Sequence, residues 1–438
     1  MGQEQLRTMN DSKITIHPAR SISGSIRLPG DKSISHRYAM LAGIAEGRSK
    51  FTNFSSGADC ASTLACMQAL GCKVTRTPEI VEIEGVGPEL RAPVRALDCG
   101  NSGSTMRMLA GILAGQPFTS EMIGDSSLSR RPMARVMKPL SEMGARLQAK
   151  GEGDRPPLRI TGGGLRAIQY RTPVASAQVK SCVLFAGLFA DGETSVDEPV
   201  RTRDHSELAL RAFGAELHRT RTEVRIRGGQ RLHAIDALVP GDISSAAFFL
   251  CAAALLPESN LVIDGVGLNP TRAVLLDVLT SLGAQVSVVN VEEHNGELIG
   301  GLVVGHRALK GLELAGAQSA ALIDELPVLA AIAPFTEQGV VISDARELRV
   351  KESDRIAVVA ANLRKMGAEV EEKEDGLRVR GRQKLHGAEI DSAGDHRIAM
   401  AFAVAALRAE GETTIKGADA ARISFPEFFT MLDGLAVR

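Results

Sequence analysis

The stretch SEMGARLQA, residues 141–149, joins a helix end, a glycine and a strand, and it decides the fold of this chain. A helical pattern stops at Gly144, and a β-type run begins directly after it. Glycine adopts the left-handed backbone conformation without strain, so it commonly follows the last helical turn. The pattern recurs at intervals of about one sixth of the chain. Its other copies are QALGCKVTR (68–76), RAFGAELHR (211–219), TSLGAQVSV (280–288), RKMGAEVEE (364–372) and MLDGLAVR (431–438), with Gly71, Gly214, Gly283, Gly367 and Gly434.

A second and almost wholly apolar helix is expected in each repeat. The clearest copy is ISSAAFFLCAAALLPES, residues 243–259. A helix that is apolar all round is buried, and a short strand is expected after each one. Six such units in 438 residues predict an α/β fold of two similar domains, each with three repeats around buried helices. The other copies are residues 32–47, 102–115, 176–192, 319–334 and 395–411.

Composition narrows the class of protein. The formal net charge of −1 gives no strong field for nucleic acid, and the absence of Trp with 3% aromatic residues makes a stacking platform for single strands improbable. No apolar run approaches the roughly 20 residues of a membrane helix. The start, MGQEQLRTMNDSK, lacks the apolar run of a signal peptide. Six cysteines without CxxC or zinc spacing predict free thiols, no metal site and a cytoplasmic protein.

The openings of the apolar helices are expected to bind anions. Main-chain N–H groups and the positive end of the helix dipole attract phosphate at such positions. The plain alternative is that the small polar residues there only cap the helices. Cations at several of the same openings favour anion binding. They are Lys32, Arg37, Arg107, Lys180 and Arg397.

Three motifs in the first half of the chain carry these cations and glycines. LPGDKSISHR (28–37) ends a strand at Gly30, and Ser33 or Ser35 can cap the following helix. It lacks the spacing of a P-loop. CGNSGSTMR (99–107) has glycines that let a ligand approach the backbone, although an ordinary turn would look similar. In GDSSLSRRPM (124–133) we expect Arg131 just before a helix start, where it can bind a carboxylate or phosphate.

Further motifs follow towards the C-terminus. ASAQVKS (175–181) places neutral donors at a buried helix opening, and TRDH (202–205) follows the next strand. IDELP (323–327) is expected to place two carboxylates inside an apolar helix, where they are either a partnered structural pair or a general base. ELRVKESDR (347–355) usually means a surface salt-bridge cluster. In GDHRIAM (394–400) an Arg opens the last apolar helix and needs an anion.

Taken together, the motifs resemble one family, the EPSP synthases (3-phosphoshikimate 1-carboxyvinyltransferases). LPGDKSISHR, GNSGSTMR, RRPM, SAQVKS, DELP, RVKESDR and DHRIAM stand in the family's order, and the similarity runs from about residue 14 to residue 434. The resemblance implies an inside-out α/β barrel in each of two domains, with three βαβαββ units apiece. It places residues 1–28 and 241–438 in one domain and 29–240 in the other, with the active site in the cleft between them.

The resemblance also implies roles for individual residues. Asp324 matches the carboxylate that deprotonates the shikimate hydroxyl, and Glu352 matches the proton donor to the methylene carbon; Lys32 is the third expected catalytic residue. The residues that match the shikimate 3-phosphate site are Lys32, Ser33, Arg37, Ser176, Ala177, Gln178, Arg203, Asp324 and Lys351. The residues that match the phosphoenolpyruvate site are Lys32, Gly103, Arg131, Gln178, Arg355 and Arg397.

The implied reaction transfers the enolpyruvyl group of phosphoenolpyruvate to the 5-hydroxyl of shikimate 3-phosphate, in chorismate and aromatic amino-acid biosynthesis. The scheme requires no metal or organic cofactor. It implies two small-molecule substrates, a monomer, no nucleic-acid or membrane partner, and inhibition by glyphosate because Gly103 leaves room for it.

The sequence departs from the family pattern at two places. Ile423 and Ser424 precede Phe425-Pro426, where some members carry a Lys, and Arg422 is the nearest cation. Other members have Asn where Glu347 stands. Both departures concern the C-terminal edge of the phosphoenolpyruvate site.

Two other functions are alternatives. UDP-N-acetylglucosamine enolpyruvyl transferase shares the fold and the donor, but the pattern of that family has a Lys-Asn pair in the first loop and a reactive loop Cys. Here the pair is Lys32-Ser33, and SLS without Cys precedes the RRPM motif. A non-catalytic repeat scaffold would not need Asp324 and Glu352 beside arginines.

Overall fold

The computed structural model describes residues 12–438, so the expectation about a signal peptide at the start lies outside the described residues. The chain forms two compact units. Among the described residues, unit 1 holds 12–29 together with Gly241–Glu292 and Leu298–Arg438, and unit 2 holds Gly30–Pro240 and Glu293–Glu297. The sequence analysis assigned all of 241–438 to one domain. The five residues 293–297 group with unit 2 instead, because the buried Glu297 carboxylate lies 2.6 Å from Nδ1 of the buried His205.

Unit 2 contains three repeats, each with a small sheet and two longer helices. Its elements are α2 (Lys32–Ile44), β3 (Ala45–Thr52), α3 (Ala58–Ala69), β4 (Lys73–Arg76), β5 (Ile80–Val86), β6 (Leu97–Asp98), α4 (Gly103–Ala114), β7 (Thr119–Ile123), the 3-10 turn η1 (Leu128–Arg130), α5 (Ala134–Glu142), β8 (Arg146–Gly151), β9 (Arg155–Thr161), β10 (Gln169–Arg171), α6 (Ala177–Gly187), β11 (Glu193–Asp197), α7 (His205–Ala212), β12 (Leu217–Arg219), β13 (Glu223–Arg227), β14 (Leu232–His233) and β15 (Asp236–Leu238).

Unit 1 repeats the same plan. Its elements are β1 (Lys13–Ile16), β2 (Ser21–Arg27), α8 (Ile243–Leu255), β16 (Asn260–Gly267), α9 (Val274–Leu282), β17 (Gln285–His294), β18 (Glu297–Gly305), β19 (Leu312–Leu314), α10 (Gly316–Ala321), α11 (Leu326–Ile332), η2 (Ala333–Phe335), β20 (Val340–Ile342), η3 (Arg346–Val350), α12 (Arg355–Lys365), β21 (Val370–Lys373), β22 (Gly376–Val379), β23 (Glu389–Asp391), α13 (His396–Ala406), β24 (Thr413–Lys416), η4 (Ala418–Ile423), α14 (Phe428–Leu435) and β25 (Ala436–Val437).

The repeat is a βαβαββ unit, as the resemblance implied. In the second repeat of unit 2, β6 pairs in parallel with β7 across the helix α4, and β7 and β8 both pair antiparallel with β9. The sheet order is therefore β6-β7-β9-β8, and the same order recurs in β10-β11-β13-β12 and β19-β20-β22-β21. A parallel pair needs a crossover helix, which places one helix of each repeat against the sheet. The predicted α/β class is confirmed.

The first repeat of each unit takes its first strand from a distant part of the chain. In unit 2, β14 and β15 pair in parallel with β3, which joins Leu232 to Ala45 and Asp236 to Lys50. In unit 1, β2 pairs in parallel with β16, which joins Ser23 to Asn260. Each unit is thus closed by strands from both ends of its own segment.

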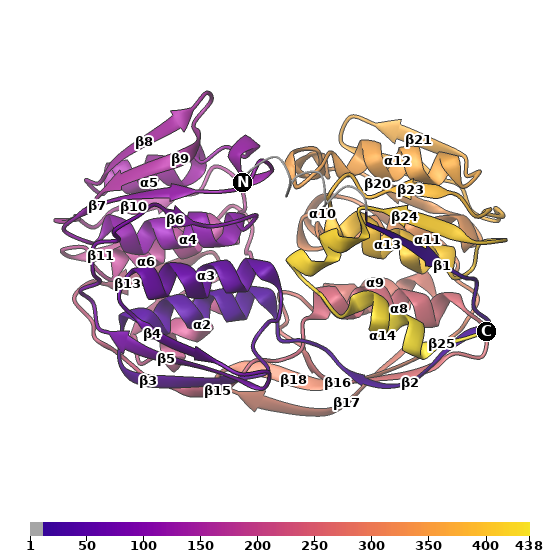
Figure 1. Ribbon diagram of the computed structural model, residues 1–438, viewed down its shortest axis with the longest axis horizontal. Helices are drawn as coiled ribbons and strands as arrows, with labels where there is room; N and C mark the ends of the chain where they lie inside the picture. The colour runs from indigo at the N-terminus through magenta and orange to yellow at the C-terminus, as the bar shows by residue number, and fades with distance from the viewer. Residues whose placement is uncertain (1–11) are drawn as a thin grey trace. The chain divides into compact units, whose positions relative to one another are not determined.

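The predicted all-apolar helices form the core of each unit. Every residue of α8 and of α13 is buried, and most residues of α2, α4 and α6 are buried as well. In unit 2, α4 packs against α2 and α6, and Figure 1 shows these helices between the sheet of β3–β5 and the sheet of β7–β9. In unit 1, α8, α11 and α13 pack on one another. Helices inside and sheets outside make each unit an inside-out barrel.

The glycine pattern is confirmed at five of its six positions. Gly71, Gly144, Gly214, Gly283 and Gly367 have φ of +104°, +110°, +92°, +102° and +91°. The prediction for Gly434 was wrong, because this residue lies inside α14 and has no positive φ. The helical pattern continues there to Leu435, a buried residue that holds the last turn against the core.

The helix expected over residues 319–334 is also interrupted. Asp324 and Glu325 lie in a turn between α10 and α11, not inside a helix. Pro327 stands in the first turn of α11, where its missing N–H costs nothing, whereas inside a continuous helix it would break the ladder. The turn gives Asp324 a partly exposed position.

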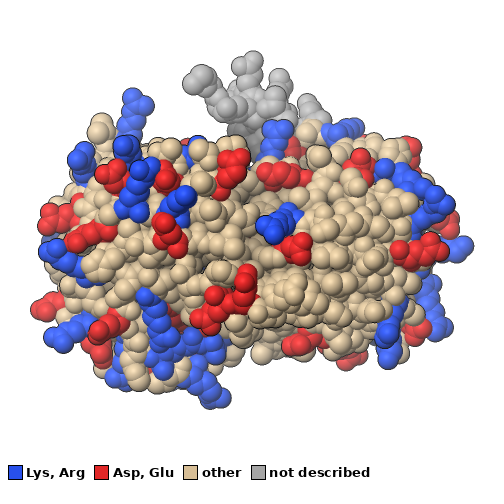
Figure 2. Space-filling view, turned by 90° about the horizontal axis from the view of Figure 1, so that it is seen from below, with Lys and Arg blue, Asp and Glu red and all other residues tan. Residues whose placement is uncertain are grey.

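The surfaces carry both charge signs. In the view of Figure 2, Lys and Arg side chains are interspersed with Asp and Glu on each unit. Between residues 12 and 438, no helix has the length and apolar character needed to cross a membrane.

Buried polar side chains join three helices in unit 2. Nδ1 of His36 in α2 lies 2.7 Å from Oγ1 of Thr63 in α3, which lies 2.7 Å from Oγ1 of Thr105 in α4. Thr105 in turn donates to Oγ of Ser102, the N-cap of α4. Burial, together with the positive charges of Lys32 and Arg37, holds the pKa of His36 well below its usual value. His36 is therefore neutral in the folded chain.

The glycine pattern predicts opposite effects of two Gly→Ala changes. Gly144→Ala should lower the free energy of unfolding by about 1 kcal/mol, because alanine is strained at a positive φ although its Cβ would have room, with the carbonyl oxygen of Gly164 3.8 Å away. Gly434→Ala should raise it by up to about 1 kcal/mol, because its Cβ enters open space in a helix. Urea midpoints of both variants test this. Equal effects of the two changes would contradict the assignment.

From the lowered pKa of His36 we expect the free energy of unfolding to depend on pH. Its pKa is lowered in the folded state, so below about pH 6.5 the unfolded chain binds a proton that the folded chain does not. The wild type should then lose up to about 1.4 kcal/mol per pH unit from this residue, until the folded pKa is reached. His36→Gln lacks this contribution, so the stability difference between wild type and variant should fall between about pH 7 and 5. A difference that stays constant would contradict the assignment.

Candidate active site

The predicted site residues of unit 2 begin at α2. The N-cap is Asp31, whose side chain accepts from the Ile34 N–H at 2.9 Å, and not Ser33 or Ser35 as the sequence suggested. An ionised Asp caps a helix as well as Ser does and complements its dipole. Lys32 is the first helical residue, and its Nζ lies 3.1 Å from Oδ2 of Asp59. Lys32 is thus a partly buried cation at a helix start.

Arg37 lies one turn further along α2 and is buried. Its Nε donates to Ser206 Oγ at 2.7 Å, its Nη2 to Ser181 Oγ at 2.8 Å, and its Nη1 to the Ser33 carbonyl at 2.8 Å. Burial, with a smaller contribution from nearby Arg203, lowers the pKa of Arg37 to about 10 against the opposing charge of Glu207. Arg37 is therefore still a cation at neutral pH, fixed by neutral hydroxyls.

The starts of α4 and α6 lie together. Ser102 caps α4, Gly103 is its first residue, and Ser176 caps α6, whose first residue is Ala177. The Gln178 amide joins the two helices, since its Oε1 accepts from Arg107 at 2.8 Å and its Nε2 donates to Ser104 at 2.9 Å. Two helix starts with neutral donors and an arginine form an anion-binding arrangement.

Gly103 lies close to two arginines. A Cβ at this position would lie 3.1 Å from Nη1 of Arg107 and 3.4 Å from Nη1 of Arg131. Arg131 follows the 3-10 turn η1, three residues before α5, and its Nη2 donates to Asn101 at 2.9 Å and Ser127 at 3.0 Å. The glycine leaves space in front of these guanidinium groups.

Two further cations of this unit differ in role. Arg203 lies half-buried in the loop between β11 and α7, near Arg37. Lys180 was expected to be a cation at a helix opening, and that expectation was wrong. Its side chain is 1% exposed, with Nζ 2.9 Å from both Glu198 and Glu207. Two buried carboxylates surround this charge, so it is not offered to a ligand.

Arg355 is the centre of the candidate site residues in unit 1. It is the first residue of α12, its side chain is 2% exposed, and Asp354 caps the helix. Its Nε donates to Asp395 at 2.8 Å, and its Nη2 donates to Glu352 at 2.7 Å. Burial lowers the pKa of Arg355, but Asp395, Glu352 and Asp324 outweigh burial and raise it. The guanidinium is therefore permanently charged.

Asp324 lies beside two cations. Its Oδ1 is 3.6 Å from Nη1 of Arg355 and 3.7 Å from Nζ of Lys351. Lys351 also lies 3.7 Å from Glu347, at the position where other members of the family have Asn. The structure thus brings Asp324, Lys351, Glu352 and Arg355 together, and their run in the sequence is not a surface salt-bridge cluster. Asp324 and Glu352 are both partly exposed, with side chains 20% and 16% exposed, so a ligand could reach either carboxylate.

Arg397 lies near the start of α13. Asp395 caps this helix by accepting from the Arg397 N–H at 2.9 Å, and the guanidinium of Arg397 lies 5.9 Å from the ring centre of Phe248. Its Nη1 lies 3.5 Å from the Ser244 carbonyl. The Asp395 carboxylate thus holds both the guanidinium of Arg355 and the backbone N–H of Arg397. The sequence analysis missed this role, although an Asp before an apolar helix is a recognisable cap.

Glu325 separates from its neighbour Asp324. It is buried, accepts a hydrogen bond from Ser244, and lies 3.4 Å from Arg272. The sequence allowed each carboxylate of the IDELP motif to be either a partnered structural group or a general base. Glu325 is a partnered structural group. The sequence also departs from the family pattern at the end of η4. Arg422 is exposed there, and Ile423 is buried.

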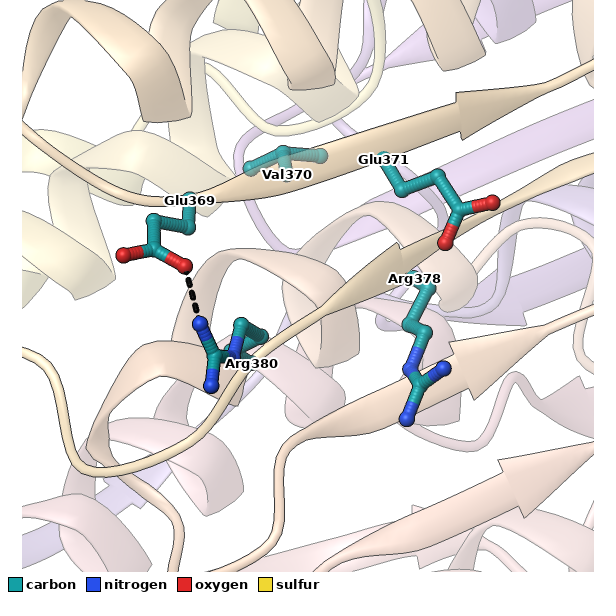
Figure 3. Close-up of a pocket in the computed structure, with 5 residues that line it drawn as sticks. All are labelled: Glu369, Val370, Glu371, Arg378 and Arg380. Carbon is teal, nitrogen blue, oxygen red and sulfur yellow. Dashed lines mark hydrogen bonds and ion pairs between the residues drawn. The ribbon is translucent and has the colours of Figure 1, made fainter.

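A surface hollow of about 470 Å³ lies away from these residues. It is lined by residues in and beside β21 and β22 of unit 1. Figure 3 shows there an ion pair between Glu369 and Arg380, with Glu371 and Arg378 on facing strands. Cross-strand pairs of opposite charge are ordinary on solvated sheets. Within the described part of the chain, no group of His, Cys, Asp and Glu has the geometry to hold a metal ion, and the six cysteines are buried thiols.

Comparison with known proteins gives the family. A family model described as EPSP synthase (3-phosphoshikimate 1-carboxyvinyltransferase) matches residues 16–432. A relative from Koribacter versatilis, named 3-phosphoshikimate 1-carboxyvinyltransferase, is 63% identical over 97% of this chain and 99% of its own length. One of the same name from Solibacter usitatus is 59% identical over 96% of this chain and 99% of its own length.

Solved structures agree with this assignment. The structure of EPSP synthase from Acinetobacter baumannii superposes with a TM-score of 0.86 at 43% identity, over 97% of this chain and 98% of that one. The enolpyruvyl transferase NikO from Streptomyces tendae gives a TM-score of 0.79 at 19% identity, over 97% and 98% of the two chains, which shows the shared fold. The chain is an enzyme that belongs to the EPSP synthase family.

Proposed function

We propose that this enzyme transfers the enolpyruvyl group of phosphoenolpyruvate to the 5-hydroxyl of shikimate 3-phosphate, releasing phosphate. The observation that carries the residue-level proposal is the buried Arg355, which holds Asp324 and Glu352 at one cation. The reaction needs one group for a hydroxyl proton and another for a carbon proton. Two reachable carboxylates fixed at one guanidinium supply both.

The acceptor site is proposed in unit 2. The phosphate of shikimate 3-phosphate would bind at the capped starts of α2 and α6, where backbone donors and cations converge. Asp324 and Lys351 of unit 1 would complete the site at the shikimate ring, which requires both units. The unit 2 residues are Lys32, Ser33, Arg37, Ser176, Ala177, Gln178 and Arg203.

The donor site is proposed to share Lys32 and Gln178 with the acceptor site. Gly103 and Arg131 contribute from unit 2, and Arg355 and Arg397 contribute from unit 1. Several fixed cations are needed because two polyanions must be held side by side. The proposal therefore builds the active site from residues of both units, with a single chain as the functional protein and glyphosate as an inhibitor of the donor site.

The chemistry proceeds by addition and then elimination. Asp324 takes the proton of the shikimate 5-hydroxyl while the hydroxyl oxygen attacks C2 of phosphoenolpyruvate. The protonated carboxyl of Glu352 gives its proton to C3. The C2–O bond to phosphate then breaks as Glu352 takes a proton back from the new methyl group, which restores the double bond. Lys32, Arg131, Arg355 and Arg397 stabilise the charge that develops on the donor phosphate and carboxylate.

One assay separates this proposal from its alternatives. The protein is mixed with phosphoenolpyruvate and either shikimate 3-phosphate or UDP-N-acetylglucosamine, and released phosphate is measured. Release with shikimate 3-phosphate alone supports the proposal, release with the sugar nucleotide supports the other transferase, and no release supports a binding scaffold.

The two carboxylates predict a loss of turnover. Glu352→Gln and Asp324→Ala should each lower kcat by about 100-fold or more, because a general acid–base contribution is removed. KM for either substrate should change by less than about fivefold, since the cations that bind remain. Steady-state kinetics measure both constants, and Glu374→Gln, an exposed carboxylate of the same unit, is the control. Turnover near the wild-type value in either variant would remove its assigned role.

Gly103 predicts sensitivity to glyphosate. We expect millimolar glyphosate to inhibit the wild type in competition with phosphoenolpyruvate. Gly103→Ala should weaken inhibition by about tenfold or more, because its Cβ would lie 3.1 Å from Arg107 and 3.4 Å from Arg131 and would displace one of them. Inhibition constants for both proteins test this, with KM for phosphoenolpyruvate as the internal reference. An uninhibited wild type would contradict the prediction.

A further inference from the structure

Lys180 is a buried cation for which the proposed reaction has no use. It lies in α6, its side chain is 1% exposed, and its Nζ is 2.9 Å from Glu198 and 2.9 Å from Glu207. Glu198 and Glu207 are themselves almost fully buried. Burying three charges costs desolvation energy that their attraction often only offsets, and an apolar replacement is often as stable. Stability alone therefore does not account for this cluster, which we call the Lys180 clamp.

One arm of the clamp reaches the loop that carries Arg203. Glu198 follows β11, and its carboxylate accepts from both the backbone N–H and the hydroxyl of Thr202. These bonds close the five residues 198–202 into a compact turn. Arg203 follows directly after this turn, so its backbone position is set by the hold of Lys180 on Glu198.

The other arm reaches the residue that orients Arg37. Glu207 lies in α7 next to Ser206, whose hydroxyl accepts from Nε of Arg37 at 2.7 Å. The charge of Glu207 also raises the pKa of Arg37 against the effect of burial. Lys180 thus fixes the part of α7 that holds the Arg37 guanidinium.

The helix of Lys180 contributes directly as well. Its neighbour Ser181 accepts from Nη2 of Arg37 at 2.8 Å, and Oγ of Ser181 lies 2.6 Å from Oγ of Ser206. Oγ of Ser181 also donates to the carbonyl of Ala177 at 2.6 Å, one turn back at the start of α6. One buried cation therefore connects α6, the Arg203 loop and α7.

We propose that Lys180 is a positioning residue for the acceptor phosphate, which it never touches. By holding Glu198 and Glu207 it sets the spacing between Arg37, Arg203 and the start of α6. This inference rests on the proposed function, because those three features are the proposed phosphate site of shikimate 3-phosphate. The donor site shares Lys32 and Gln178 with the acceptor site, but its other proposed residues, Gly103, Arg131, Arg355 and Arg397, lie outside the clamp. The donor should therefore lose much less affinity than the acceptor when the clamp is broken.

The test is whether Lys180→Met changes KM for the two substrates by different amounts. KM for shikimate 3-phosphate should rise by about tenfold or more, as is usual when a supporting residue behind a binding group is lost. KM for phosphoenolpyruvate should stay within about twofold and kcat within about threefold. Calorimetric titration with shikimate 3-phosphate alone should show the same loss of affinity, and this readout does not depend on turnover.

A second variant covers the case in which Lys180→Met does not fold. Lys180→Met with Glu207→Gln removes one cation and one anion, so the formal charge of the clamp is unchanged. Its affinity for shikimate 3-phosphate should also fall by about tenfold, because α6 and the Arg203 loop are no longer tied to α7.

Gln116→Met is the matched control for loss of a buried polar group in the same unit. Gln116 is 1% exposed, and its amide accepts from the Leu90 N–H at 2.9 Å and donates to the Pro88 carbonyl at 3.1 Å. It should lower the unfolding midpoint without changing either KM.

The outcomes separate the two proposals. Wild-type affinity for shikimate 3-phosphate in both clamp variants would overturn the positioning role, as would equal losses for both substrates that follow the loss of stability seen with Gln116→Met. Failure of the wild type itself to bind shikimate 3-phosphate or to release phosphate would overturn the proposed function, and the positioning role with it.

Discussion

Each buried helix must satisfy the N–H groups of its first turn without help from bulk water, and this constraint shapes both units. Five of these helices begin at a Ser or Asp whose side chain accepts a main-chain N–H. They are α2 at Asp31, α4 at Ser102, α6 at Ser176, α8 at Asp242 and α13 at Asp395. The candidate binding residues follow within a few positions of four of these caps. The polar groups that let the helices be buried therefore also define where an anion can approach.

Sequence could predict the repeat because its causes are local. A left-handed glycine after a helix and an all-apolar helix each have a direct signature in the chain, and five of the six glycines confirm it. Gly434 failed because the terminal helix α14 keeps its last turn packed through Leu435, a tertiary contact that the motif does not encode. The break before α11 was missed for the opposite reason, since the local signal of Pro327 was present and the apolar run concealed it.

In the candidate site, too, tertiary contacts could not be predicted from the motifs. The motifs identified the residue types, but the partners of several charges come from other elements of the fold. Lys180 looked like a ligand-binding cation because Glu198 and Glu207 lie on other elements of the sequence, and only the fold brings them within 2.9 Å. Asp324 and Glu325 are neighbours in the chain, yet one is partly exposed beside Arg355 while the other is buried against Arg272. Adjacent positions in a turn point in different directions, and no spacing rule separates them.

The first repeat of each unit takes its first strand from a distant part of the chain, and this matters for folding during translation. Residues 30–240 contain every strand of the three unit 2 sheets, so this unit can close while the ribosome is still translating the rest. The strand β2 emerges far earlier, but its partner β16 begins only at Asn260. The beginning of the chain must therefore remain unpaired until unit 2 has been made, and an early, Ile-containing segment without its sheet is one that chaperones would need to shield.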